Sequence, residues 1–184
     1  MGRAIEWLIA HAESAPDGDG LQWPLSTSDR HRWRWWCHGA PGIALTFLKL
    51  YEHTREERHP ELARRALRSD RADIRYANLS QCHGLSGLGE IYLEAARVLG
   101  ERYWHEQAQS IADDLLSLAR QDRDGSLSWL VEDPYLATGD LMVGYSGVLH
   151  FLLRMSSDGR SANNDRGCAG LPLSLDIDVS ANAG

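Results

Sequence analysis

The sequence predicts an all-α protein made of stacked helical hairpins, joined by glycine turns and short β-like loops. Two observations support this prediction. First, a Gly-x-x-Gly turn occurs three times, at 39–42, 84–87 and 144–147, and a largely apolar stretch follows each copy. Second, a more polar segment with helix-forming character precedes each turn. One such helix pair cannot bury its inner face alone, so repeated pairs are expected to stack.

The polar segments are expected to form outer helices and the apolar segments inner helices. We place the outer helices at 3–12, 60–68 and 104–120, and the inner helices at 43–51, 88–99 and 148–155. The segment at 104–120 shows helical spacing clearly. Its apolar face carries Ala108, Ile111, Ala112, Leu115, Leu116 and Ala119. The inner segments are apolar on several sides, which suits helices packed deep in a bundle.

Two Asp-Gly pairs give further support for a repeat. Asp19-Gly20 follows the first outer helix and shortly precedes Trp23, while Asp124-Gly125 follows the third and shortly precedes Trp129. Asp-Gly favours a tight turn, so we expect each tryptophan to begin a short extended segment. Because the third glycine turn recurs without cysteine, we attribute the glycines to close helix packing.

Composition and charge narrow the classes of protein to which the chain can belong. With 184 residues, 43% of them hydrophobic and 24% charged, the chain resembles an ordinary globular domain. The net charge of −7 disfavours nucleic acid as a partner. Apolar runs such as 43–50 are too short for a membrane span, and the first residues lack the pattern of a secretion signal.

We divide the chain into a repeat domain at 1–156 and a polar C-terminal tail at 157–184. The tail is rich in Ser, Asp, Gly and Asn, and we expect it to be disordered. It contains Cys168, which we interpret as a spare thiol. The other two of the three cysteines lie in His-Gly turns, which favours metal-binding or catalytic thiols in a reducing cytoplasm over disulfides.

The first two glycine turns carry the main functional signal. Cys37 lies in Trp-Cys-His-Gly-Ala-Pro-Gly, and Cys82 and His83 lie in Gln-Cys-His-Gly-Leu-Ser-Gly. Three such soft ligands could bind one zinc ion (Zn²⁺) and leave its fourth position open, as catalytic zinc sites do. The alternative is two small buried cysteines and a capped histidine. His38 follows Cys37 as His83 follows Cys82, and we expect it to orient a ligand or to transfer a proton.

These motifs resemble the lanthionine synthetase C-like family of lanthipeptide cyclases. The resemblance rests on Trp-Cys-x-Gly-x-Pro-Gly, Cys-His-Gly-x-x-Gly and the cysteine-free third turn, and it spans roughly 1–156. It implies an α/α toroid with zinc bound by Cys37, Cys82 and His83. It also implies a dehydrated precursor peptide as substrate, whose cysteine thiolate adds to dehydroalanine or dehydrobutyrine and closes a thioether ring.

The chain departs from the family pattern in its number of turns. A complete toroid of the family has more helix pairs than the three glycine turns found here, so the resemblance is to the C-terminal half of the cyclase domain. The earlier half of the family fold supplies a proton-transferring histidine and an aspartate near it, whereas His11 is followed by Ala12 and by no glycine turn. We therefore expect a partial toroid, and as its consequence instability, self-association, or a partner chain or domain that completes it.

Other functions remain open at this point. A cyclase-like module could bind zinc and a thiol or peptide without catalysis. Helical toroids also host carboxylate glycosidases, but Glu90 and Asp140 lack a convincing paired context. A Cys-His peptidase is disfavoured, because side chains adjacent in sequence seldom face each other as nucleophile and base. Zinc with two cysteinate ligands is electron-rich, which suits thiol alkylation better than hydrolysis.

A basic, aromatic run at 30–36 leads into the first turn. It could form a wall that holds a peptide through cation–π contacts. It could also be an extended segment with its arginines in solvent and its tryptophans in the core, and we favour this second interpretation. Near the third turn, Tyr145 and His150 could line the same cavity, but we expect them to serve helix packing.

Overall fold

The computed structural model describes residues 2–16, 18–68, 78–132 and 138–163, with side chains up to 157. The helices are α1 (Gly2–Ala10), α2 (Ala40–Thr54), α3 (Arg58–Arg68), α4 (Leu85–Leu99), α5 (Arg102–Ser117) and α6 (Tyr145–Asn163). The strands are β1 (Glu13–Ser14), β2 (Leu21–Gln22), β3 (Arg120–Gln121) and β4 (Leu127–Ser128). The tail predicted to be disordered was 157–184: its first part, 157–163, is instead helical as the end of α6, and the rest, with Cys168, lies outside the described residues.

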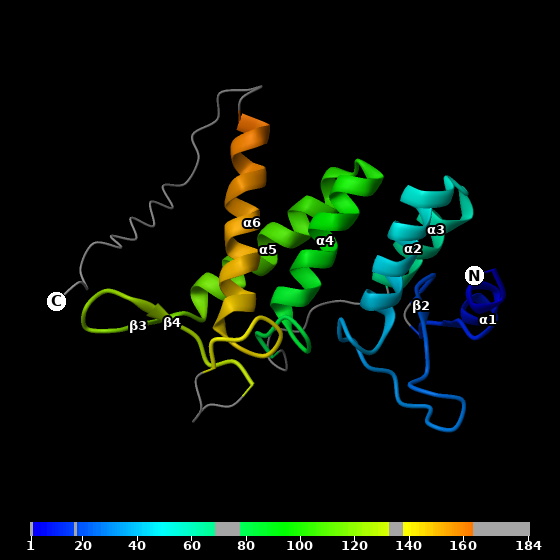
Figure 1. The fold of residues 1–184 in the computed structure, drawn as a ribbon, viewed down its shortest axis with the longest axis horizontal. Helices are drawn as coiled ribbons and strands as arrows, with labels where there is room; N and C mark the ends of the chain where they lie inside the picture. Colours follow the sequence, from blue (N-terminus) through cyan, green and yellow to red (C-terminus); the bar gives the residue numbers. More distant parts are fainter. Residues whose placement is uncertain (1, 17, 69–77, 133–137, 164–184) are drawn as a thin grey trace.

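The architecture is all-α, as predicted. Helices α2, α4 and α6 lie side by side, with their first turns at the lower edge of Figure 1. Helix α3 packs on α2, and α5 packs on α4 and α6. The core between them is filled by fully buried side chains that include Phe47, Leu48, Ile91, Leu115 and Phe151. In the described chain no helix combines the length and apolar character needed to cross a membrane.

The inner helices differ from their predicted bounds. They begin at Ala40, Leu85 and Tyr145, because each Gly-x-x-Gly forms the first helical turn itself. Helix α6 also continues to Asn163, past the end of its apolar pattern at Met155. The outer helix α5 ends at Ser117, since Arg120 already pairs with Ser128 in the β3–β4 ladder.

The two short hairpins confirm the repeat. Strands β1 and β2 pair antiparallel, as do β3 and β4, and a tryptophan directly follows each hairpin. The indole Nε1 of Trp23 donates to the carbonyl of Leu8, and that of Trp129 donates to the carbonyl of Leu115, each at 2.7 Å. The extended segments therefore end before the tryptophans instead of beginning at them. Each buried indole ties its hairpin to the end of the preceding helix.

The three glycine turns stack on one another. A Cβ built on Gly87 would lie 2.9 Å from the carbonyl carbon of Gln81 and 3.3 Å from Cβ of Trp36, in the first turn. A Cβ on Gly147 would lie 2.9 Å from Cβ of Gln81, in the second turn. The backbone N–H of Cys82 also donates to the carbonyl of Met142 in the third, at 2.7 Å. The glycines are therefore packing residues, and they hold the two cysteine turns side by side.

Candidate metal centre

The site lies where the first two glycine turns meet, at the beginnings of α2 and α4. One ligand atom each from Cys37, Cys82 and His83 lies within 4.8 Å of the other two, and all three residues are partly buried. Residues 45 positions apart in the sequence are thus brought within reach of a single ion. The group could hold a metal ion, as the sequence led us to expect.

The electrostatics of the thiols fit a cation. Burial raises the pKa of Cys82 to about 11, assisted by a hydrogen bond with Cys37, by the charge on Cys37 and by that on Glu132. Without a positive charge nearby, the thiol of Cys82 therefore resists ionisation. A divalent ion reverses this effect because coordination deprotonates a thiol. Two sulfurs and one imidazole nitrogen are also the soft donor set that zinc prefers.

His83 has a carboxylate partner that sequence reasoning missed. Its Nδ1 lies 2.8 Å from Oε1 of Glu132, in the loop after β4. The hydroxyl of Ser80 donates to the same oxygen at 2.6 Å. Burial alone would raise the pKa of Glu132, but the hydrogen bonds from Ser80 and His83 outweigh it and hold the pKa below its usual value. Glu132 lies 49 residues after His83 and belongs to no motif, so the sequence does not single it out. The only available signal is the repeat, which places the loop of Glu132 just before the third glycine turn.

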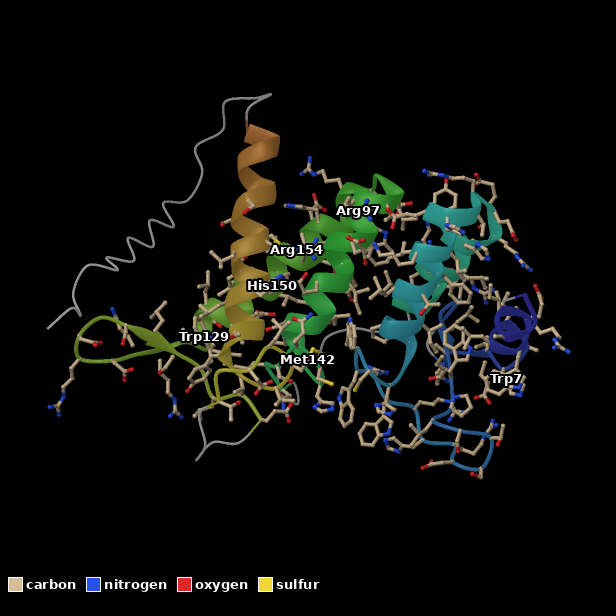
Figure 2. All side chains as sticks on the ribbon, in the orientation of Figure 1. Trp7, Arg97, Trp129, Met142, His150 and Arg154 are labelled. Atoms are coloured by element: carbon tan, nitrogen blue, oxygen red, sulfur yellow. The ribbon has the colours of Figure 1, made fainter. Side chains whose placement is uncertain are left out.

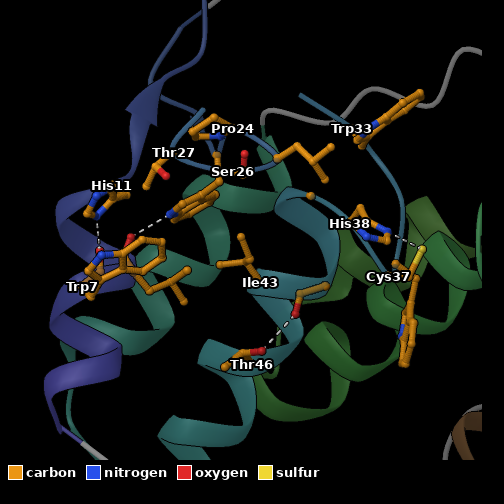
Figure 3. A pocket seen from close by; sticks show the side chains of 16 residues that line it. Trp7, His11, Pro24, Ser26, Thr27, Trp33, Cys37, His38, Ile43 and Thr46 are labelled. Atoms are coloured by element: carbon orange, nitrogen blue, oxygen red, sulfur yellow. Dashed lines mark hydrogen bonds between the residues drawn. The ribbon is translucent and has the colours of Figure 1, made fainter. Parts of the chain in front are cut away.

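His38 lies against the first cysteine. Its Nδ1 is 3.1 Å from Sγ of Cys37, and the rest of the residue is exposed. The contact is drawn as a dashed line in Figure 3. The adjacent residues Cys37 and His38 thus contact each other, while His38 does not belong to the group that could hold a metal.

A cavity of about 530 Å³ opens beside Cys37 and His38 (Figure 3). Helix α1 contributes Trp7 and α2 contributes Ile43 to its wall. The segment between β2 and the first glycine turn supplies much of the rest, including Trp33. The lining is mainly apolar and aromatic, so the space next to Cys37, the one candidate metal ligand in its wall, suits an uncharged or apolar group.

The tryptophans of the basic, aromatic run are not in the core, so that part of our interpretation is wrong. Trp36 is 36% exposed, and Trp33 and Trp35 are only half-buried. The rings of Trp33 and Trp35 instead form a surface ladder with those of two histidines. His31 and Trp33 have ring centroids 4.1 Å apart, Trp33 and Trp35 4.0 Å, and Trp35 meets His83 edge-on at 4.7 Å.

The arginines of the run follow the expected pattern more closely. Arg30 and Arg32 both pair with Glu13 on β1, and Arg34 is exposed. Two of the three arginines are therefore already paired within the chain, although they share a single carboxylate. This leaves the aromatic faces, more than the charges, as the distinctive feature of the surface.

The third turn holds structural contacts. Met142 occupies the position that Cys37 and Cys82 occupy in the other turns. Oδ1 of Asp140 accepts hydrogen bonds from the backbone N–H of Met142 and Val143, at 3.0 and 2.8 Å. The bond from Val143 is the main reason that the pKa of Asp140 lies below its usual value.

Glu90, the other carboxylate considered for a glycosidase, is buried between α4 and α6. Its Oε1 lies 2.6 Å from Nδ1 of His150, and its second oxygen pairs with Arg154. Figure 2 shows both partners on α6. His150 therefore serves helix packing, as expected, and Glu90 is engaged in the same interface. Neither carboxylate is free for paired acid/base chemistry.

Fold and site together define the class of protein: an all-α chain of helical hairpins whose glycine turns bring two cysteines and a histidine into a candidate metal centre. A family model described as lanthionine synthetase C-like protein matches residues 2–165. This covers most of the chain, so the protein belongs to the lanthionine synthetase C-like family. The match also extends past 156, in keeping with the length of α6.

Proposed function

We propose that this chain is a zinc-dependent cyclase-like domain that activates a peptide cysteine for thioether ring formation. The observation that carries the proposal is the convergence of Cys37, Cys82 and His83 within 4.8 Å. Family membership supports it, because lanthionine synthetase-like proteins are cyclases that act on peptides. The reducing cytoplasm remains the expected compartment, since both thiols must stay unoxidised to bind a metal.

In this proposal Cys37, Cys82 and His83 hold Zn²⁺. When bound, zinc would supply the positive charge that stabilises the thiolate form of a substrate cysteine at neutral pH. Two cysteinates and a neutral histidine balance the double charge of the ion, and three protein ligands leave one position for an incoming sulfur.

The reaction adds one thiol across one carbon–carbon double bond. The substrate thiol gives up its proton, and its sulfur forms a bond to the β-carbon of dehydroalanine or dehydrobutyrine. The electron pair of the double bond moves to the α-carbon, which then takes up a proton, so no atoms are lost. His38 is our candidate for handling one of these protons, because it lies beside Cys37 and lines the cavity.

The dehydrated precursor peptide is assigned to the cavity beside Cys37 and His38. Its volume of about 530 Å³ is within the range of ligand sites, and its aromatic walls suit the apolar parts of a peptide. A further chain or domain would complete the helical assembly, in line with the partial toroid that the resemblance implies.

A second candidate function is a cyclase-like module that binds zinc and a thiol or peptide without closing rings. The observation that favours it concerns His11, which stacks on Trp7 with ring centroids 4.0 Å apart and lies in no glycine turn. His11 therefore does not match the acid/base histidine that the resemblance implies. Both functions need the same metal centre, and they differ only in turnover.

Metal analysis tests the zinc site that both functions need. The purified protein should carry about one zinc per chain. Cys37→Ala and Cys82→Ala should lose it, whereas Glu106→Gln, an exposed change on α5, should keep it. A folded wild-type protein that takes up no zinc would refute both functions.

A peptide assay then separates the two functions. A dehydrated peptide with one free cysteine is incubated with the zinc-loaded protein and treated with a thiol-alkylating reagent. Ring closure consumes the thiol without changing the mass, so cyclised peptide escapes alkylation in the mass spectrum. Full alkylation, together with measurable peptide binding, would favour the non-catalytic module.

A further inference from the structure

A hydrogen-bonded network surrounds the ring of His83. The backbone N–H of Ser80 donates to Oδ1 of Asn78 at 2.8 Å. The hydroxyl of Ser80 accepts from the backbone N–H of His83 at 3.2 Å and donates to Oε1 of Glu132 at 2.6 Å. Nδ1 of His83 lies 2.8 Å from the same oxygen and completes the network. Two distant loops, before α4 and after β4, are thus joined around one imidazole.

The network fixes the carboxylate of Glu132 independently of the histidine. Ser80 is fully buried, so its hydroxyl has one direction in which to donate. The side chain of Asn78 adds a second hydrogen bond to Glu132. Such side-chain networks hold their members in place when each donor and acceptor is satisfied. Glu132 is therefore held in position to act on His83.

We propose that Glu132 is a positioning residue that fixes the tautomer of His83, so that Nδ1 carries the hydrogen and Nε2 offers its lone pair to a metal. This inference rests on the metal centre in the proposed function. A neutral imidazole has one donor and one acceptor nitrogen, and a carboxylate accepts only, so the Nδ1 contact selects which nitrogen is protonated. Carboxylate partners of this kind orient metal-binding histidines and raise their basicity.

Three further observations favour positioning over other roles for Glu132. Trp35 meets the His83 ring edge-on at 4.7 Å, which restricts rotation of the ring about its own bond. Glu132 itself stands outside the group whose ligand atoms lie within 4.8 Å of one another. Its hydrogen bonds to Ser80, Asn78 and His83 also leave it poorly placed to move protons to a substrate.

The test measures zinc affinity and the His83 tautomer. Affinity is determined by competition with a chromophoric chelator, and the tautomer by long-range proton–nitrogen NMR on the zinc-free and zinc-loaded protein. Glu132→Ala should weaken zinc binding by about 10- to 100-fold and give a mixture of tautomers. Glu132→Gln is nearly isosteric and should give a smaller loss. Glu106→Gln, which removes an exposed charge paired with Arg102, is the matched control and should change neither.

The outcomes separate this inference from the proposed function. If the wild-type protein binds zinc and Glu132→Ala binds it equally well with the Nδ1–H tautomer unchanged, the positioning role is refuted and the metal centre stands. If the wild-type protein binds no zinc, the proposed function fails. Should Glu132→Ala unfold, Glu132→Leu carries the test, because it also removes the acceptor from Nδ1 of His83, and an unchanged tautomer there would equally refute the role.

Discussion

Replacing Gly87 by alanine is expected to destabilise the protein and to disturb the contact between its two cysteine turns. The new Cβ would lie 2.9 Å from the carbonyl carbon of Gln81, closer still to its oxygen, and 3.3 Å from Cβ of Trp36. Gln81 directly precedes Cys82, and Trp36 directly precedes Cys37. The clash therefore falls on the backbone that carries both thiols.

The size of the stability loss in Gly87→Ala follows from two opposing effects. Within a helix, alanine is favoured over glycine by about 1 kcal/mol. To reach an ordinary contact of 3.4 Å, the carbonyl carbon of Gln81 would have to retreat by about 0.5 Å, and its oxygen by more. Overpacking of this kind costs about 1–3 kcal/mol, and we take the upper end because no flexible side chain can absorb the shift. The net loss is about 2 kcal/mol.

Urea denaturation followed by circular dichroism measures this loss, and metal analysis measures its effect on the site. Gly139→Ala is the control, because a Cβ there has nothing within 4 Å. It should stay within about 0.5 kcal/mol of the wild type. A Gly87→Ala protein as stable as the wild type, with undiminished zinc binding, would refute the close stacking of the turns.

Three further predictions concern other parts of the chain. Trp129→Phe removes the buried bond to the carbonyl of Leu115 and should cost about 1–3 kcal/mol in urea unfolding, whereas an unchanged midpoint would mean that water replaces the indole. In the zinc-free protein, burial raises the pKa of Cys82 from 9.0 to about 11, so its stabilising contribution is complete below pH 9 and is lost as the pH rises through 11. Unfolding measured across that interval should show the loss in the wild type and a flatter profile in Cys82→Ser; equal profiles would contradict it. Leu149 and Leu153 on α6 are 43% and 57% exposed, so Leu153→Lys should reduce concentration-dependent light scattering, and equal scattering would argue against self-association through α6.

Much of the fold could be predicted because the chain repeats itself. Helical spacing located each helix, but it missed where the inner helices begin and where α6 ends. The reason is physical: glycine is a poor helix former by propensity, and only the close approach seen at Gly87 explains why glycine starts these helices. The sequence showed that Trp23 and Trp129 occupy equivalent positions in the repeat. Their hydrogen bonds to the preceding helices could be identified only in the structure.

The candidate site was predictable only where residue type and repeat coincided. Cys37, Cys82 and His83 could be grouped because they occur in matching turns, and the structure brings them together. Glu132 could not be found, because one glutamate in a loop looks like any solvated charge until the loop folds onto His83. The aromatic run was misjudged, since sequence does not distinguish rings stacked at a surface, such as Trp33 and Trp35, or an exposed ring such as Trp36, from rings in a core.

The stacking of the glycine turns also bears on how the chain folds. The described helices contact mainly their neighbours along the chain, so folding can nucleate at one hairpin and propagate to the next. Both thiols belong to the first two hairpins, yet the backbone N–H of Cys82 finds its acceptor, the carbonyl of Met142, only in the third. Assembly of the third hairpin is therefore the step that completes the scaffold beneath the thiols.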